Sequence, residues 1–104
     1  MKVKVKFFAP FRELFGASES EIELRSATDV QELLNLLCDS DERRDKIFDQ
    51  SGELRPYVMI LKNRQPIQIF DGVQTKLKEG DEIAIFPPVN GGERFGFQRR
   101  DTKV

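Results

Sequence analysis

Apolar and charged residues alternate at the start of the chain, and a period of two is typical of a β-strand with one buried face. Within residues 2–7 every second residue is valine or phenylalanine, and the residues between them are lysines. Phe8 follows on the lysine side of this strand. Residues 19–24 alternate in the same way, with glutamates outward. We expect these two strands to pair antiparallel, because the lysines and glutamates would then attract one another across the sheet.

A spacing of three to four residues between apolar positions marks a helix after residue 28. Four apolar residues share one face of this predicted helix: Val30, Leu33, Leu34 and Leu37. Thr28 is expected to cap its first turn, with the Gln31 side chain reaching back to complete a capping box. A single helical turn is expected within residues 9–16, and a loop or a second short helix within residues 41–48.

Three further strands are predicted in the second half of the chain. Residues 57–62 form a strand that is apolar on both faces, with Val58 and Ile60 on one face and Tyr57, Met59 and Leu61 on the other. Residues 66–70 would form a short strand at the edge of the sheet, because a proline has no N–H to donate to a neighbouring strand. Residues 82–86 form the last strand, with Ile83 and Ile85 on one face.

The order of strand, strand, helix, strand, short strand and strand predicts an α+β fold in two layers. The most economical arrangement is a mixed sheet of four to five strands, covered on one face by one main helix. The first and last strands would lie side by side and parallel in its middle, which is the β-grasp, or ubiquitin-like, arrangement. Residues 1–92 would form this domain, and residues 93–104 would be a C-terminal extension.

The sheet face turned away from the helix is expected to display apolar residues. Alternation places Phe8 and Phe86 on that face, with Met59 or Leu61 of the third strand as further members. Clustered exposed aromatic residues mark interaction sites, so these residues are candidates for partner binding. In the alternative interpretation, loops or the segment Phe95–Phe97 cover them, and a register shift of one residue would turn them inward.

Charge and composition narrow the possible functions. The 104 residues, of which 38% are hydrophobic, suffice for one domain with a modest core. The chain carries 17 cationic and 18 anionic side chains, and residues 93–104 hold four of the cations and two of the anions. Residues 1–92 are therefore weakly acidic, which argues against nucleic-acid binding as the main task.

Few side chains could carry out chemistry. The chain has no histidine and no cysteine or carboxylate group at metal-ligand spacing, so neither a metal site nor a bound cofactor is expected. The one cysteine, Cys38, excludes an internal disulfide and is expected in the core. No nucleophile–base pair or phosphate-binding loop indicates a catalytic site. We expect a cytoplasmic protein, because the chain starts without a signal-peptide pattern and no segment is long enough to cross a membrane.

The last predicted strand runs into the segment Pro-Pro-Val-Asn-Gly-Gly at residues 87–92. The two prolines favour an extended exit from the sheet, and the five residues after the first proline reach on the order of 15 Å. Glycines have no side chain, so such a tip could thread a narrow channel, and a terminal glycine carboxylate is open to adenylation. The segment has a second interpretation, because Asn90-Gly91 is a preferred hairpin turn.

Two stretches of the chain carry a family resemblance. They are residues 4–16, Lys-Val-Lys-Phe-Phe-Ala-Pro-Phe-Arg-Glu-Leu-Phe-Gly, and residues 80–92, Gly-Asp-Glu-Ile-Ala-Ile-Phe-Pro-Pro-Val-Asn-Gly-Gly. In order and spacing, residues 1–92 resemble the MoaD/ThiS family of ubiquitin-like sulfur carriers, and more narrowly the small subunits of molybdopterin synthase. The resemblance implies a β-grasp fold.

The resemblance also implies a chemistry and partners. Gly92 would carry a thiocarboxylate, after adenylation with ATP by a ubiquitin-activating-like adenylyltransferase of the MoeB or ThiF type. A large synthase subunit of the MoaE type would then use the sulfur to build the dithiolene of molybdopterin. Phe8 and Phe86 would belong to the partner-facing surface. Five residues would form the threading tail: Pro87, Pro88, Val89, Asn90 and Gly91.

The chain departs from the family after its second glycine, where family members usually end and twelve residues follow here. With Gly92 in a peptide bond there is no free carboxylate to adenylate. In one interpretation the chain is a precursor that a protease cuts between Gly92 and Glu93. In another it is a β-grasp binding module that does not conjugate, and in a third the extension belongs to a fused product or a cloning artefact.

The pathway also has more than one interpretation. Sulfur could serve thiamine or cysteine synthesis or tRNA thiolation, or the protein could be a modifier that is attached to lysines. The Phe-Pro-Pro-Val form of the ending, at residues 86–89, favours molybdopterin.

Overall fold

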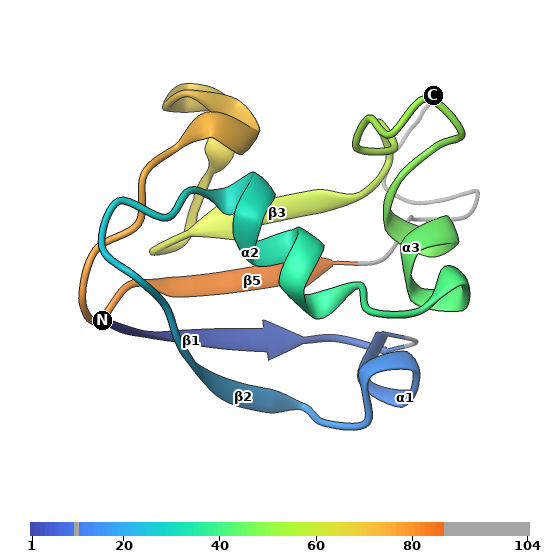
Figure 1. The fold of residues 1–104 in the computed structure, drawn as a ribbon, viewed down its shortest axis with the longest axis horizontal. Helices are drawn as coiled ribbons and strands as arrows, with labels where there is room; N and C mark the ends of the chain where they lie inside the picture. The colour runs from blue at the N-terminus through green and yellow to red at the C-terminus, as the bar shows by residue number, and fades with distance from the viewer. Residues whose placement is uncertain (10, 87–104) are drawn as a thin grey trace, which may run out of the picture.

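A mixed β-sheet and a layer of helices make up the part of the chain that the structure describes (Figure 1). The structure is a computed structural model, and it describes residues 1–9 and 11–86. The main elements follow one another as β1 (Lys2–Phe7), α1 (Phe11–Phe15), β2 (Glu19–Glu23), α2 (Val30–Leu37), α3 (Asp41–Ile47), β3 (Met59–Lys62), β4 (Gln65–Pro66) and β5 (Glu82–Phe86). Two short 3-10 helices, Ile67–Ile69 and Gly72–Gln74, lie between β4 and β5.

The five strands are ordered β2-β1-β5-β3-β4 across the sheet. β1 and β5 are parallel neighbours in the middle, with Phe7 opposite Ile85. β2 pairs antiparallel with β1, and β3 pairs antiparallel with β5. The predicted α+β, β-grasp arrangement is therefore confirmed, including the parallel central pair formed by the first and last strands.

The inner face of the sheet, which we define as the face covered by α2, forms the core. It carries Val5, Ile60 and Ile83 at the centre of three neighbouring strands, and each is fully buried. The predicted apolar face of α2 packs against them, and its four residues are buried. Burying a large aliphatic side chain stabilises a fold by about 1.5–3 kcal/mol, so this layer supplies most of the stability of the domain.

The predicted capping box of α2 is wrong by one residue. The N-cap is Asp29, whose Oδ1 accepts a hydrogen bond from the Glu32 N–H at 2.9 Å, while Glu32 Oε1 accepts from the Asp29 N–H at 3.1 Å. The Thr28 hydroxyl instead donates to the Arg25 carbonyl at 2.7 Å. The Thr28 carbonyl also accepts from the Leu77 N–H, which ties Thr28 to the segment before β5 and leaves Asp29 as the first residue of the helix cap.

The predicted strand at residues 66–70 is also largely wrong. Strand pairing ends at Pro66, and a 3-10 helix follows. Strand alternation would place Ile67 and Ile69 on the same face, but Ile67 is buried in the core whereas Ile69 is 62% exposed. The chain turns after Pro66 because burying Ile67 against the core outweighs continuing a two-residue edge pairing.

The remaining predicted elements differ from the structure mainly at their ends. The helical segments within residues 9–16 and 41–48 are confirmed as α1 and α3. β3 begins at Met59, opposite Phe86, rather than at Tyr57. The alternation predicted for this stretch still holds, because Val58 is buried and Tyr57 is exposed.

Candidate functional site

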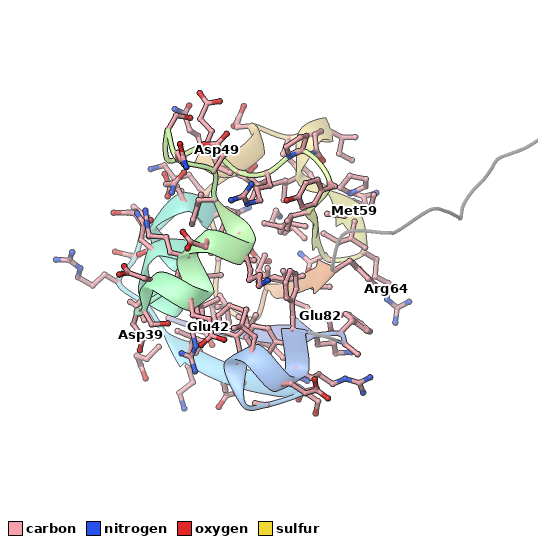
Figure 2. The ribbon with its side chains drawn as sticks, turned by 90° about the vertical axis from the view of Figure 1, so that its right-hand side faces the viewer. Asp39, Glu42, Asp49, Met59, Arg64 and Glu82 are labelled. Carbon is pink, nitrogen blue, oxygen red and sulfur yellow. The ribbon has the colours of Figure 1, made fainter. Side chains whose placement is uncertain are left out.

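The outer face of the sheet, opposite α2, is uncovered within the described residues. In the view of Figure 2, Asp39 and Glu42 lie on the helical side of the molecule, and Met59, Arg64 and Glu82 lie on the other side. The outer face consists of the alternate residues of the same strands that bury their other side chains in the core. It divides into an apolar half and a charged half.

Two phenylalanine rings form the centre of the apolar half. Phe8 and Phe86 stack with their centroids 4.3 Å apart and their planes 8° from parallel. The stack follows from the sheet register, because Phe7 lies opposite Ile85 in the parallel pair and the next residue of each strand therefore meets its counterpart. Phe8 remains 37% exposed despite this contact. Aromatic pairs of this kind contribute about 0.5–1.5 kcal/mol beyond the area that they bury.

The third strand extends the apolar surface. Met59 lies opposite Phe86 in the antiparallel pair of β3 and β5, and it is 51% exposed. Leu61 follows on the same face, opposite Ala84, and is partly buried. The structure thus brings four predicted partner-binding residues together, which we call the apolar patch: Phe8, Phe86, Met59 and Leu61.

The charged half of the outer face lies on β1, β2 and the first residue of β5. Lys4 Nζ is 3.7 Å from Glu19 Oε2, and Lys6 Nζ is 3.6 Å from Glu82 Oε2. The predicted attraction between lysines and glutamates across the sheet is confirmed. Exposed ion pairs contribute little to stability, about 0–1 kcal/mol each, so these charges act mainly by bordering the apolar patch.

The Gly-Asp-Glu sequence before β5 has a structural role that the sequence did not reveal. Asp81 is 7% exposed; its Oδ1 accepts from Asn63 Nδ2 at 2.9 Å and its Oδ2 accepts from the Lys78 N–H at 2.8 Å. Asn63 Oδ1 in turn accepts from the Glu82 N–H at 2.9 Å. This network joins the turn between β3 and β4 to the first residue of β5. Asp81 therefore fixes the register of the strand that carries Phe86.

The only cysteine is the predicted core residue. Cys38 ends α2, is buried, and its backbone N–H donates to the Leu34 carbonyl at 2.9 Å. Burial raises the pKa of its thiol to about 11. At neutral pH Cys38 is therefore a protonated packing residue and a poor nucleophile.

Over residues 1–9 and 11–86, no group of three or more His, Cys, Asp and Glu side chains could hold a metal ion. No helix in the same part of the chain is long and apolar enough to span a membrane.

The predicted carrier tail lies outside the described residues. This applies to the threading residues, to Gly92 and to the predicted processing site at Glu93: Pro87, Pro88, Val89, Asn90, Gly91, Gly92 and Glu93. The structure does define where the tail is attached. The last described residue, Phe86, ends β5 and belongs to the apolar patch. A partner that covers the patch would therefore also contact the residue to which the tail is attached.

Comparison with known proteins gives consistent matches along most of the chain. The model of the ThiS family matches residues 5–92. Small archaeal modifier protein 3 of Haloferax volcanii is 33% identical, over 88% of this chain and 100% of its own. The molybdopterin synthase sulfur carrier subunit of Escherichia coli is 34% identical, over 86% of this chain and 99% of its own.

The solved structures agree with these matches. The solution structure of small archaeal modifier protein 1 from Methanosarcina acetivorans resembles this fold with a TM-score of 0.73 at 36% identity. That match covers 88% of this chain and 96% of the other.

Proposed function

This chain belongs to the ThiS family of ubiquitin-like sulfur carriers, and we propose that it carries sulfur as a thiocarboxylate on Gly92 for the synthesis of a molybdenum or tungsten pterin cofactor. Gly92 acquires its carboxylate when residues 93–104 are removed. The protein is the carried substrate and subunit of other enzymes, and ATP is consumed by the activating partner.

The main support for this function is the position of the apolar patch beside the family's glycine ending. The family match extends to residue 92, and the sequence from Phe86 reads Phe-Pro-Pro-Val-Asn-Gly-Gly. The rigid sheet presents Phe8, Phe86 and Met59 at the point where this segment begins. A partner can therefore bind the patch and accommodate the two glycines in a channel, with Gly92 six residues beyond Phe86.

The chemistry requires a free carboxylate at Gly92. In adenylation, a carboxylate oxygen attacks the α-phosphate of ATP and pyrophosphate leaves. A sulfur donor then displaces AMP at the acyl carbon, so that sulfur replaces one oxygen. An internal Gly92–Glu93 amide has no carboxylate oxygen to begin this sequence, which is why cleavage between these residues is part of the proposal.

Three partners follow from this function. An adenylyltransferase of the MoeB or ThiF type activates Gly92, and a large synthase subunit of the MoaE type receives the sulfur. A processing protease releases residues 93–104. The Escherichia coli relative is itself named a sulfur carrier subunit of molybdopterin synthase, which supports the second of these partners.

A second candidate function is protein modification. The Haloferax volcanii relative is named a small archaeal modifier protein, and attachment to a lysine would use the same activated Gly92. The two functions separate at the last step. In one the sulfur is transferred and the chain is recovered, whereas in the other the acyl group becomes bonded to a protein amine.

Mass spectrometry of the protein from its native host tests the proposal. We expect a chain that ends at Gly92 and carries a mass gain equal to the exchange of one oxygen for sulfur. Covalent adducts with other proteins would favour the modifier function instead. In a reconstituted reaction with the activating enzyme, ATP and a sulfur donor, the chain ending at Gly92 should react, and the matched full-length chain should not. Recovery of only the unmodified full-length form from the host, together with no reaction of the chain ending at Gly92, would overturn the proposal.

A further inference from the structure

The apolar patch is partly exposed in the described part of the chain. Phe8 and Met59 are 37% and 51% exposed, and their neighbours Phe86 and Leu61 are only partly buried. The patch is continuous, because its members occupy neighbouring positions on three adjacent strands. Contiguous apolar surface of this kind promotes association when it is left open.

The chain itself contains a segment with matching chemistry. Residues 93–104 have the sequence Glu-Arg-Phe-Gly-Phe-Gln-Arg-Arg-Asp-Thr-Lys-Val. Phe95 and Phe97 are two residues apart, so in an extended segment both rings lie on the same side. Arg99 and Arg100 follow directly, so the segment has an aromatic part followed by a cationic part.

The point of attachment favours an intramolecular contact. Phe86 ends β5 inside the patch, and Phe95 is nine residues farther along the chain. Nine extended residues span about 30 Å, whereas three neighbouring strands span only about 10 Å. A short tether gives an effective concentration in the millimolar range, so even a weak intrinsic affinity would keep the segment on the patch.

The outer face carries a row of glutamates two strands away from β5, with the lysines of β1 between them. β1 lies next to β5, and β2 lies beyond β1. The outer side of β2 carries Glu19, Glu21 and Glu23, opposite the lysines of β1. With Phe95 and Phe97 on the patch, the nearest of these glutamates is Glu19, which lies at the Phe8 end of β2, about 10 Å across the sheet and within reach of the two arginines that follow.

We propose that residues 93–104 lie across the outer face of the sheet in the full-length chain, with Phe95 and Phe97 on the apolar patch and the arginines toward the glutamates of β2. The functional significance of this contact rests on the proposed function, in which the patch is the surface that the partners bind. The extension then prevents carrier function in two ways. It holds the Gly92 carboxyl group in an amide, and it covers the docking surface. One cleavage removes both blocks.

Methyl NMR of the full-length protein tests the contact directly. The chain has two methionines, Met1 and Met59, so labelling methionine methyl groups with carbon-13 gives two signals. Met59 lies in the patch, and Met1 lies at the opposite end of β1. In full-length protein verified to retain Val104, ring currents from Phe95 and Phe97 should shift the Met59 signal relative to the double variant Phe95→Ala/Phe97→Ala. The Met1 signal should not change.

Two matched variants locate the contact. Gln98→Ala/Thr102→Ala alters the same segment without removing a ring or a charge and should keep the Met59 signal of the parent chain. Glu19→Gln/Glu21→Gln should move the signal part of the way toward that of the Phe95→Ala/Phe97→Ala variant, and by less at high salt, since exposed charges are screened.

Each outcome decides the proposal. Identical Met59 signals in the full-length chain and the Phe95→Ala/Phe97→Ala variant overturn it. A shift that disappears on dilution also overturns it, because the segment would then be docking on a second copy. None of these measurements uses an activating enzyme or sulfur, so the contact can fail while the thiocarboxylate is found, and the reverse.

Discussion

The two faces of the central strands differ in how their apolar residues are used. On the inner face Val5, Ile60 and Ile83 are completely buried by the helices. On the outer face of the same strands Phe8 and Met59 keep a third to a half of their surface in water. Folding accounts for the inner residues through the area that they bury, but it does not account for aromatic and thioether side chains on an open face. The comparison assigns stability to the inner face and supports the proposed recognition role of the outer face.

The largest difference is expected when one apolar side chain is truncated on each face and the free energy of unfolding is measured. Ile85→Ala on the inner face should lower it by about 2–5 kcal/mol, because a cavity remains among packed neighbours. Met59→Ala, the matched change on the neighbouring strand of the outer face, should lower it by less than about 1 kcal/mol. Urea unfolding of both variants measures the difference. Equal losses would contradict the assignment of stability to the inner face.

The pH dependence of the free energy of unfolding tests whether the Cys38 thiol is buried in the core. Burial raises the pKa of its thiol from 9.0 to about 11. The folded state therefore holds this proton more tightly than the unfolded state. The protonated thiol therefore stabilises the folded state fully below pH 9. About 2 kcal/mol of this stabilisation is lost as the pH rises from 9 to 11.

The control for this prediction is Cys38→Ala, which removes the thiol and leaves the other titrating groups. Unfolding in urea between pH 8 and 11 should show the parent chain losing stability more steeply than the variant. Parallel curves would mean that the thiol is not shielded from water by the core.

On the outer face the expected effect is on binding. Met59→Ser in the chain ending at Gly92 should weaken association with the activating enzyme by about tenfold, equivalent to about 1.4 kcal/mol, because truncated interface anchors lose binding energy of this order. Isothermal titration calorimetry measures it. Leu36→Ser is a suitable control, since Leu36 is similarly exposed but lies on α2, on the other side of the sheet. An unchanged affinity for Met59→Ser would remove Met59 from the docking surface.

The smallest effect is expected from the charges that border the patch. A double-mutant cycle on Lys6→Ala and Glu82→Ala should give a coupling energy of about 0.5 kcal/mol or less, since both side chains of the pair are partly exposed. A coupling above 1 kcal/mol would show that the outer face also contributes to folding. Thermal unfolding at low and high salt would separate attraction from packing.

Most of the fold follows from local pattern. A period of two located β1, β2 and β5, and the apolar spacing located α2, because one face of each element must be buried. The errors occur where two local solutions have similar energies. Thr28 and Asp29 are both competent caps, and the choice was made by the pairing of Thr28 with Leu77. The segment after Pro66 left the sheet because Ile67 had a place in the core.

The candidate site was predictable to different degrees. Alternation was enough to place Phe8, Phe86, Met59 and Leu61 on one face, because a strand register fixes every side chain at once. The role of Asp81 was not predictable, since its partner Asn63 is distant in the sequence and is brought to it only by the pairing of β3 with β5. The chemistry assigned to Gly92 came from family resemblance, because a glycine has no side chain whose pattern could identify it.

The parallel pairing of β1 with β5 has a consequence for folding during translation. The ribosome makes β1 first and β5 last, yet these two strands are neighbours in the centre of the sheet. Contacts between such distant parts of a chain form late and slowly, so the nascent polypeptide cannot close its sheet until β5 has emerged. Phe8 meets Phe86 only at that moment. An unfinished chain therefore lacks the centre of the proposed docking surface, which forms only after β5 has been translated.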